Sequence, residues 1–262
     1  MGDPASRVAV VGSGDSVVDH AERAVRTAGG RLVDPAAADA VVALGDEAVR
    51  DALLASAPSD RRVRPASSRG DSPVPCRVDA PVLPVRAGRH AVDPASLDDA
   101  IRGLLDGNAR RVAHPILAVG GDDEPLRRAV LDVGFVTDEP ARISEYAVDL
   151  AADREAAFRA DGVVVATPMG SDGYAAAAGG PLLEAGGGLS VVPIAPFTTR
   201  HDAWVVRDGV GISVRRDAET VSIVVDGDRR GAVTPGRPIR IEVTDRVETL
   251  RLSPSFPVDA ER

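Results

Sequence analysis

The residues best suited to chemistry follow a short apolar segment in the second half of the chain. Residues 162–166 are small or β-branched and predict a strand, which runs through a polar turn at 167–173 into an alanine-rich helix beginning near Tyr174. A glycine-bearing turn before a helix presents hydroxyls and free backbone N–H groups, which suit an anionic or polyhydroxylated ligand. The same pattern also fits an ordinary connection between a strand and a helix.

A carboxylate at the tip of an early strand is the second candidate. Residues 40–44 predict a buried strand, and Asp46 precedes a helix predicted over 47–55. Ligands of open α/β folds bind at the carboxyl edge of the parallel sheet, which is where Asp46 is expected to lie and could contact a ligand. An aspartate in front of a helix is equally typical of an N-cap, and one residue can fill both roles.

The segment 161–181, called the signature segment below, resembles a motif of the NAD kinase family. That motif reads Asp-Gly-(apolar)-Thr-Pro-Thr-Gly-Ser-Thr-Ala-Tyr and continues to Ala-Gly-Gly-Pro. The matching residues are Asp161, Gly162, Thr167, Pro168, Gly170, Ser171, Tyr174, Ala178, Gly179, Gly180 and Pro181. The departures are Met169, Asp172 and Gly173.

Two further segments resemble motifs of the same family. Residues 44–48 resemble its Gly-Gly-Asp-Gly-Thr loop and keep Gly45 and Asp46, while Ser144-Glu145 resembles an Asn-Glu pair that binds adenosine at the start of a strand. Asp226-Gly227 also resembles a family hairpin, and between alternating strands it predicts a hairpin turn without a chemical role.

The resemblance implies that the protein phosphorylates the adenosine 2′-hydroxyl of NAD, with Asp46 as the catalytic base. ATP would be the phosphoryl donor, accompanied by a divalent cation, Mg²⁺, and no side chain is predicted as a metal ligand. The resemblance also implies a homo-oligomer, a dimer or tetramer. The residues expected to bind the nucleotides are Gly45, Ser144, Glu145, Thr167, Gly170, Ser171, Asp172, Gly173 and Tyr174. Loss of the loop glycines around Asp46 favours an alternative, a non-catalytic NAD(P)-binding homologue with a sensing or regulatory role.

Composition excludes several other functions. All 31 basic residues are Arg, and the absence of Lys excludes a Walker A loop and Schiff-base chemistry. A net charge of −9 disfavours nucleic acid as a partner and would suit a salt-loving cytoplasm.

There is no apolar run long enough for a membrane span, and no secretory signal is apparent, so we expect a cytoplasmic protein. The lone Cys76 and four scattered His predict neither a disulfide nor a metal cluster.

The elements that position these residues change character along the chain. Strands and helices alternate up to about residue 108, which predicts a Rossmann-like α/β domain with a parallel sheet over 1–108. Short Val- and Ile-rich runs with regular turns follow, including separate strands predicted at 239–243 and 249–252, and they predict an all-β sandwich domain over 109–262. Residues 56–80, rich in Pro, Ser, Arg and Asp, predict a flexible loop or a surface insertion in the first domain.

Overall fold

The computed structural model describes residues 6–57, 80–121, 127–139, 142–150, 154–198, 202–216 and 220–252. The chain divides into two compact units. Unit 1 contains residues 1–52, 78–112 and 248–262, and unit 2 contains residues 53–77 and 113–247. Most of the loop predicted at 56–80 lies outside the described residues.

Unit 1 is built on a parallel sheet. Its strands, in the order β2-β1-β3-β4, are β2 (Arg31–Leu32), β1 (Arg7–Gly12), β3 (Ala40–Leu44) and β4 (Val82–Val85). The end of strand β16 (Ile239–Leu252) pairs in parallel with β4 through Thr249 and Val82. All residues of β3 and β4 are buried, as expected for strands covered on both faces.

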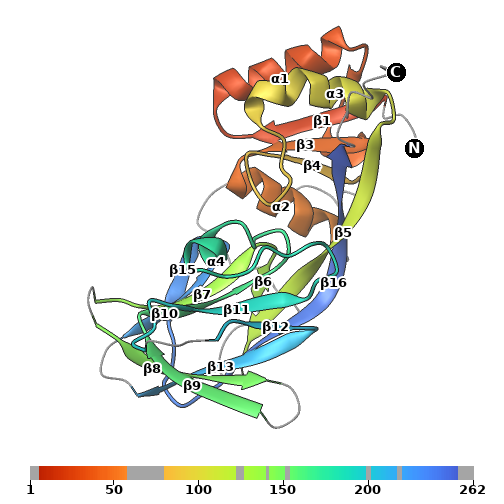
Figure 1. Cartoon of the computed structure of the whole chain (residues 1–262). Helices are drawn as coiled ribbons and strands as arrows, with labels where there is room; N and C mark the ends of the chain where they lie inside the picture. Colours follow the sequence, from red (N-terminus) through yellow and green to blue (C-terminus); the bar gives the residue numbers. More distant parts are fainter. Residues whose placement is uncertain are drawn as a thin grey trace, which may run out of the picture. The chain divides into compact units, whose positions relative to one another are not determined.

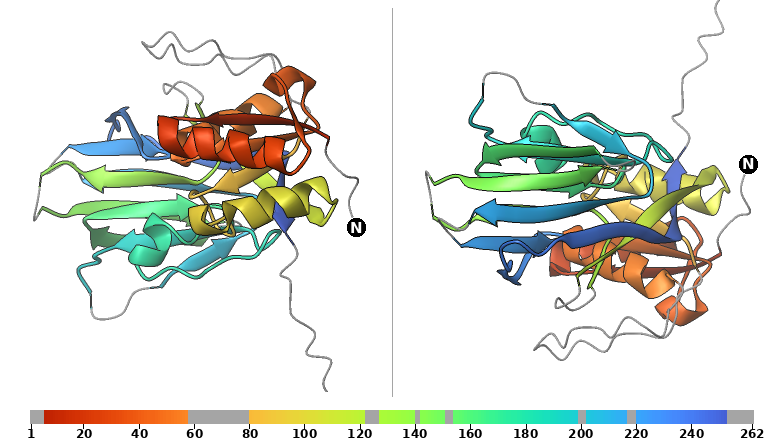
Figure 2. Two further views of the ribbon diagram at one scale, coloured as in Figure 1. Left: turned by 90° about the horizontal axis from the view of Figure 1, so that it is seen from above. Right: turned by 90° about the horizontal axis from the view of Figure 1, so that it is seen from below.

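Helices α1 (Asp15–Thr27) and α3 (Leu97–Leu105) cover one face of this sheet, and α2 (Asp46–Ser56) begins on the other (Figure 1). Figure 2 shows α1 and α3 side by side. Short 3₁₀ turns lie at Pro35–Ala37 and Pro94–Ser96. The apolar stripes of α1 and α3 meet the sheet in one core, because each helix repeats its apolar residues at the period of an α-helix.

Unit 2 is a sandwich of two antiparallel sheets. The six-stranded sheet has the order β12-β11-β10-β7-β14-β15, and the facing sheet contains β16, β13, β8 and β9. The bounds are β7 (Asp132–Thr137), β8 (Ser144–Leu150), β9 (Arg154–Ala160), β10 (Gly162–Ala166), β11 (Leu189–Ile194), β12 (Trp204–Val206), β13 (Gly209–Arg216), β14 (Val221–Val225) and β15 (Asp228–Ala232). Strands β5 (Ala109–Gly120) and β6 (Arg127–Ala129) pair with each other. Buried side chains of both sheets, including Phe135 and Tyr146, form a single core.

One helix covers the outer face of the six-stranded sheet. This helix, α4 (Tyr174–Ala177), packs Ala175 against Val164, Ala166 and Val192. Small alanines at this contact let the short helix lie close to the strands. The end of β10 and the start of α4 thereby fix the turn at 167–173 over the sheet.

The predicted fold class, an α/β unit followed by a β-rich unit, is confirmed. Two details differ from the prediction. Residues 239–243 and 249–252 belong to the single strand β16, and the sequence analysis missed β5. No described helix is both long and apolar enough to span a membrane.

Candidate functional site

The signature segment forms one ordered element, but its first hydroxyl is a structural group. The Thr167 side chain is completely buried, and its Oγ1 donates to the carbonyl of Val130 at 2.6 Å. The same oxygen accepts a hydrogen bond from the N–H of Gly170 at 3.2 Å, while the Thr167 N–H donates to the carbonyl of Leu131 at 2.9 Å. Thr167 therefore ties the turn to the residues that precede β7.

The second hydroxyl of the segment is used in the same way. Ser171 is also completely buried, and its Oγ donates to the carbonyl of Pro168 at 2.9 Å. It accepts from the N–H of Leu183 at 3.0 Å, which fastens the chain that follows α4. In this structure the two hydroxyls, which were expected to face a ligand, are buried, and each donates to and accepts from protein groups.

Gly170 lets the turn approach the neighbouring strand closely. A Cβ atom at this position would lie 2.3 Å from the carbonyl oxygen of Leu131. Gly180 is similarly confined, since its Cβ would lie 2.6 Å from Val192 and 2.8 Å from the carbonyl oxygen of Ala175. The glycines of the segment thus serve close packing of backbone on backbone.

The part of the segment that faces solvent is short. Asp172 and Gly173 are exposed, and the side chain of Tyr174 is 49% exposed at the start of α4. These three residues are the members of the predicted set in this turn that a ligand can reach directly. Asp172 and Gly173 are also where the sequence departs from the family motif.

A carboxylate missed by the sequence analysis lies next to this turn. Asp132 begins β7 and pairs with Ala166 at the end of β10. Because Val133 and Phe135 point into the sandwich core, Asp132 lies on the opposite face, which α4 also covers. Burial, together with the charge of Asp226, raises the pKa of Asp132 to about 6. An aspartate directly before an apolar alternating run was the available sequence signal.

Asp226 holds the start of β7 in place. Its carboxylate accepts hydrogen bonds from the N–H groups of Val130, Leu131 and Asp132, at distances of 2.7 to 3.1 Å. Asp226 and Gly227 have φ of 48° and 82°, as in the tight turns that join antiparallel strands, so the predicted hairpin is confirmed. The structure adds that this hairpin positions β7 beside the turn at 167–173, called the signature turn below.

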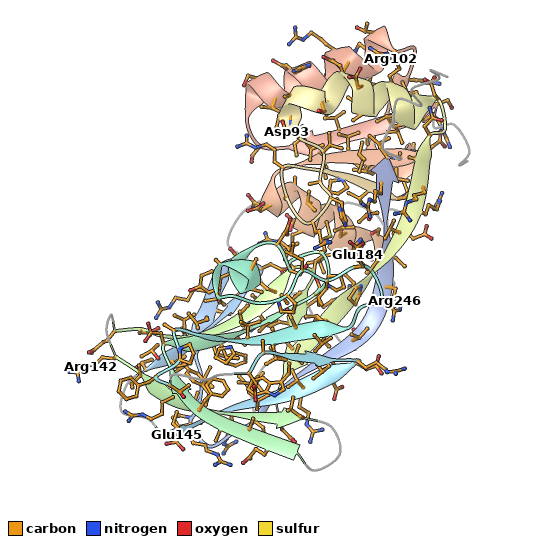
Figure 3. All side chains as sticks on the ribbon, in the orientation of Figure 1. Asp93, Arg102, Arg142, Glu145, Glu184 and Arg246 are labelled. Atoms are coloured by element: carbon orange, nitrogen blue, oxygen red, sulfur yellow. The ribbon has the colours of Figure 1, made fainter. Side chains whose placement is uncertain are left out.

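The pair Ser144-Glu145 lies elsewhere in unit 2. Ser144 is 1% exposed, and its Oγ accepts a hydrogen bond from Thr137 at 3.0 Å. The hydroxyl of the neighbouring Tyr146 donates to the carbonyl of Asp161, which lies just before β10. The turn at 167–173 lies at the other end of β10, about 17 Å away along this five-residue strand. Figure 3 shows Glu145 on β8, apart from α4. The structure therefore does not bring this pair to the turn.

In unit 1, Gly45 and Asp46 follow β3 at the carboxyl edge of the parallel sheet. Gly45 has φ 90°, and its carbonyl accepts from the N–H of Val49, so Gly45 rather than Asp46 is the residue that precedes α2. Asp46 is exposed in the first turn of α2, where a negative charge is favourable. Its predicted role as the N-cap is corrected accordingly.

The sheet order places these residues at a reversal of direction. The chain passes from β1 to β2 on one side and then to β3 on the other, which is where open α/β sheets bind ligands. Leu44, which stands where the family has glycine, is 4% exposed and lies in the core. A Cβ on Gly12 would lie 2.7 Å from the Cβ of Leu44. Leu44 therefore fills a packing position.

The described residues contain no group of three or more His, Cys, Asp or Glu side chains that is arranged to hold a metal ion. One or two carboxylates can contribute to a cation site when a substrate supplies the other ligands. Mg²⁺ commonly binds in this way, through one or two carboxylates plus phosphate oxygens and water. The exposed carboxylates of Asp46 and Glu47 suit such a partial set.

Comparison with known proteins gives a consistent result. The family model described as ATP-NAD kinase C-terminal domain matches residues 109–251. The NAD kinase of Thermococcus sibiricus is 32% identical over 179 residues, which are 64% of this chain and 63% of that protein. The NAD kinase of Methanosarcina barkeri is 35% identical over 109 residues, 40% of each protein. The matches thus span less than two thirds of these relatives' length.

Two solved structures share the fold. An NAD kinase from Archaeoglobus fulgidus, in complex with ATP, matches with a TM-score of 0.63 at 21% identity and covers 94% of this chain and 93% of its own. Yeast NADH kinase, complexed with NADH, matches with a TM-score of 0.69 at 13% identity and covers 96% and 84%. The family model alone spans 143 of the 262 residues, and the chain therefore belongs to the NAD kinase family.

Proposed function

We propose that the protein is an NAD kinase that transfers the γ-phosphoryl group of ATP to the 2′-hydroxyl of the adenosine ribose of NAD. Family membership supports this proposal most strongly. The structure adds an exposed carboxylate, Asp46, at the ligand-binding edge of a parallel sheet. It also adds an ordered turn that exposes Asp172, Gly173 and Tyr174.

In the proposed reaction, Asp46 accepts the proton of the 2′-hydroxyl as the oxygen attacks the γ-phosphorus. The new bond joins that oxygen to phosphorus, the bond to the bridging oxygen breaks, and ADP leaves with the electron pair. Positioning and charge neutralisation dominate such transfers, and Mg²⁺ bound with ATP would neutralise the phosphate charge. Glu47 makes that neutralisation more important, because its exposed carboxylate otherwise repels phosphate.

We assign different tasks to the residues of the predicted nucleotide site. Asp172, Gly173 and Tyr174 contact the dinucleotide, while Thr167 and Ser171 hold the turn in shape through their buried hydroxyls. Gly170 and Gly45 supply backbone conformation. Asp132, on the face covered by α4, is added as a candidate partner for a ribose hydroxyl. Ser144 is not part of the assignment because it is buried and already bonded.

The test is NADP formation by the purified protein with Mg²⁺, ATP and NAD. Asp46→Asn should lower the rate by about 10²- to 10⁴-fold, the usual contribution of an oriented base. Affinity for NAD, measured by calorimetry, should change little. Asp51→Asn, on the same helix and also exposed, is the matched control and should keep its activity. An Asp46→Asn enzyme with most of its activity would refute the assignment.

One observation favours a second candidate function, a catalytically impaired homologue that binds NAD(P). Leu44 and Glu47 replace loop glycines of the family, and Glu47 adds a negative charge where phosphate is expected. Such a protein should bind NAD⁺ in a calorimeter and show no heat with Mg·ATP. The kinase should bind both.

Light scattering on the same samples would measure the proposed dimer or tetramer.

A further inference from the structure

Unit 2 contains a cavity of about 570 Å³ that the proposed reaction does not use. Its lining comprises Pro115, Pro168, Gly186, Gly187, Gly188, Leu189, Val205, Val206, Arg207, Asp208, Val243 and Arg246. All of these residues belong to unit 2. The volume lies within the range of small-molecule sites in proteins. Only Pro168 is shared with the signature segment.

The cavity is positively charged within a negatively charged protein. Its ionisable lining residues are Arg207, Asp208 and Arg246, which together carry one net positive charge, against −9 for the chain. Neither arginine has an ion-pair partner among the residues that the structure describes. Figure 3 marks Arg246 on β16. Both guanidinium groups therefore keep their donors available for an incoming anion.

One wall of the cavity is bare backbone. Gly186 and Gly188 both have φ of 85°, a conformation that side-chain-bearing residues rarely adopt. A Cβ on Gly186 would meet no atom within 4 Å, so the space in front of it is open. A Cβ on Gly188 would lie 2.3 Å from the carbonyl oxygen of Val206. A ligand can therefore approach the backbone closely at Gly186, whereas the absence of a side chain at Gly188 lets the chain pack against Val206.

We propose that this cavity binds a small phosphate-bearing ligand. Arg207 and Arg246 bind the phosphate group, because a planar guanidinium offers paired N–H donors that match two phosphate oxygens. Pro115, Pro168 and Val243 provide an apolar surface for the rest of the ligand. The site is distinct from the exposed residues of the turn, and its ligand would contact that turn at Pro168.

Calorimetric titration of the full chain with inorganic pyrophosphate tests the proposal. Arg207→Gln and Arg246→Gln should each weaken binding by about 10- to 100-fold, the range for a lost hydrogen bond to a charged group. Arg240→Gln is the matched control, since Arg240 is an exposed arginine on the same strand as Arg246 and lies outside the cavity. It should bind pyrophosphate like the unmodified protein.

Four outcomes would overturn the proposal. The first is no measurable pyrophosphate binding by the unmodified protein, and the second is unchanged affinity in both cavity variants. The third is equal affinity for citrate, which would show a general anion site rather than a phosphate site. The fourth is weaker binding of pyrophosphate by Tyr174→Ala, which would place the anion at the nucleotide site. We expect this variant to bind pyrophosphate with unchanged affinity. Binding is measured without turnover, so failure here and failure of the kinase assay are separate results.

Discussion

At the scale of single residues, the most informative side chain is Thr167, whose hydroxyl joins two parts of the chain that are far apart in sequence. Thr167→Val keeps the shape of the side chain but removes the hydroxyl that bonds to the carbonyl of Val130 and the N–H of Gly170. We expect a loss of about 1–3 kcal/mol in the free energy of unfolding. Urea denaturation followed by circular dichroism measures it.

Thr244→Val is the matched control for that substitution, because Thr244 is exposed on β16 in the same unit. Its effect should stay within about 0.5 kcal/mol. Equal stability of the two variants would mean that the buried hydroxyl contributes nothing. The turn would then depend on its backbone contacts alone.

Asp132 gives a pH dependence of known sign. Its pKa of about 6 in the folded protein lies above the ordinary value of 3.8, so the folded state holds more protons between these two pH values. Its contribution therefore favours folding below about pH 4 and is lost as the pH rises through 6. Asp132→Asn should stabilise the protein at pH 7.5, by roughly 2–3 kcal/mol, and change little at pH 4.

Denaturation of both proteins at the two pH values measures this difference. An equal effect of Asp132→Asn at pH 4 and pH 7.5 would contradict it. The same substitution should reduce NADP formation if Asp132 contacts the ribose. Burial raises the pKa of this carboxyl beside the turn, and a shift of this kind is typical of functional groups.

At the scale of elements, the contact between the signature turn and β7 depends on a missing side chain. Gly170→Ala would place a Cβ 2.3 Å from the carbonyl oxygen of Leu131, so the turn or the strand must move. We expect a loss of about 1–3 kcal/mol in unfolding free energy and weaker NAD binding. Thermal denaturation and calorimetry with NAD measure the two effects.

Gly134→Ala is the corresponding control on β7. A Cβ there would meet its nearest atoms at 3.8 Å, which is ordinary contact, and the strand backbone accepts alanine. This variant should be as stable as the unmodified protein or more stable by up to about 1 kcal/mol. Similar losses in both variants would show that packing at Gly170 is not special.

Continuous apolar runs in the sequence predicted the strands that are buried along their whole length. The apolar run at 162–166 and the buried run at 40–44 gave β10 and β3 with correct bounds, because every residue of each is buried. Strand β5 was missed because it contains Pro115 and two adjacent arginines. Polar residues of β16 similarly concealed its continuity, since alternate residues face solvent along a strand.

The direction of the site hydroxyls could not be predicted in the same way. The partner of Thr167 is the carbonyl of Val130, 37 residues earlier in the chain, and this residue, which lies between β6 and β7, is held by Asp226, almost 100 residues away in sequence. Sequence motifs identify which residues belong together. They do not distinguish a hydroxyl that binds a ligand from one that binds the backbone.

At the scale of the whole molecule, charge is the dominant property. The chain carries 40 acidic and 31 basic residues, and a net charge of −9 opposes compaction through mutual repulsion. Added salt shortens the range of this repulsion, from about 10 Å at 0.1 M to about 3 Å at 1 M. Screening should therefore stabilise the folded chain over this interval.

We expect the melting temperature to rise as KCl increases from 0.1 to 1 M. Screening worth about 1–2 kcal/mol corresponds to roughly 2–8 °C for a chain of this size. Calorimetry in KCl measures the rise, and sucrose at equal osmolarity, which screens nothing, is the control. Because screening is nearly complete at 1 M, most of the gain should fall below that concentration. A melting temperature that stays constant or falls would show that favourable ion pairs, such as Arg7 with Asp39, outweigh the net repulsion.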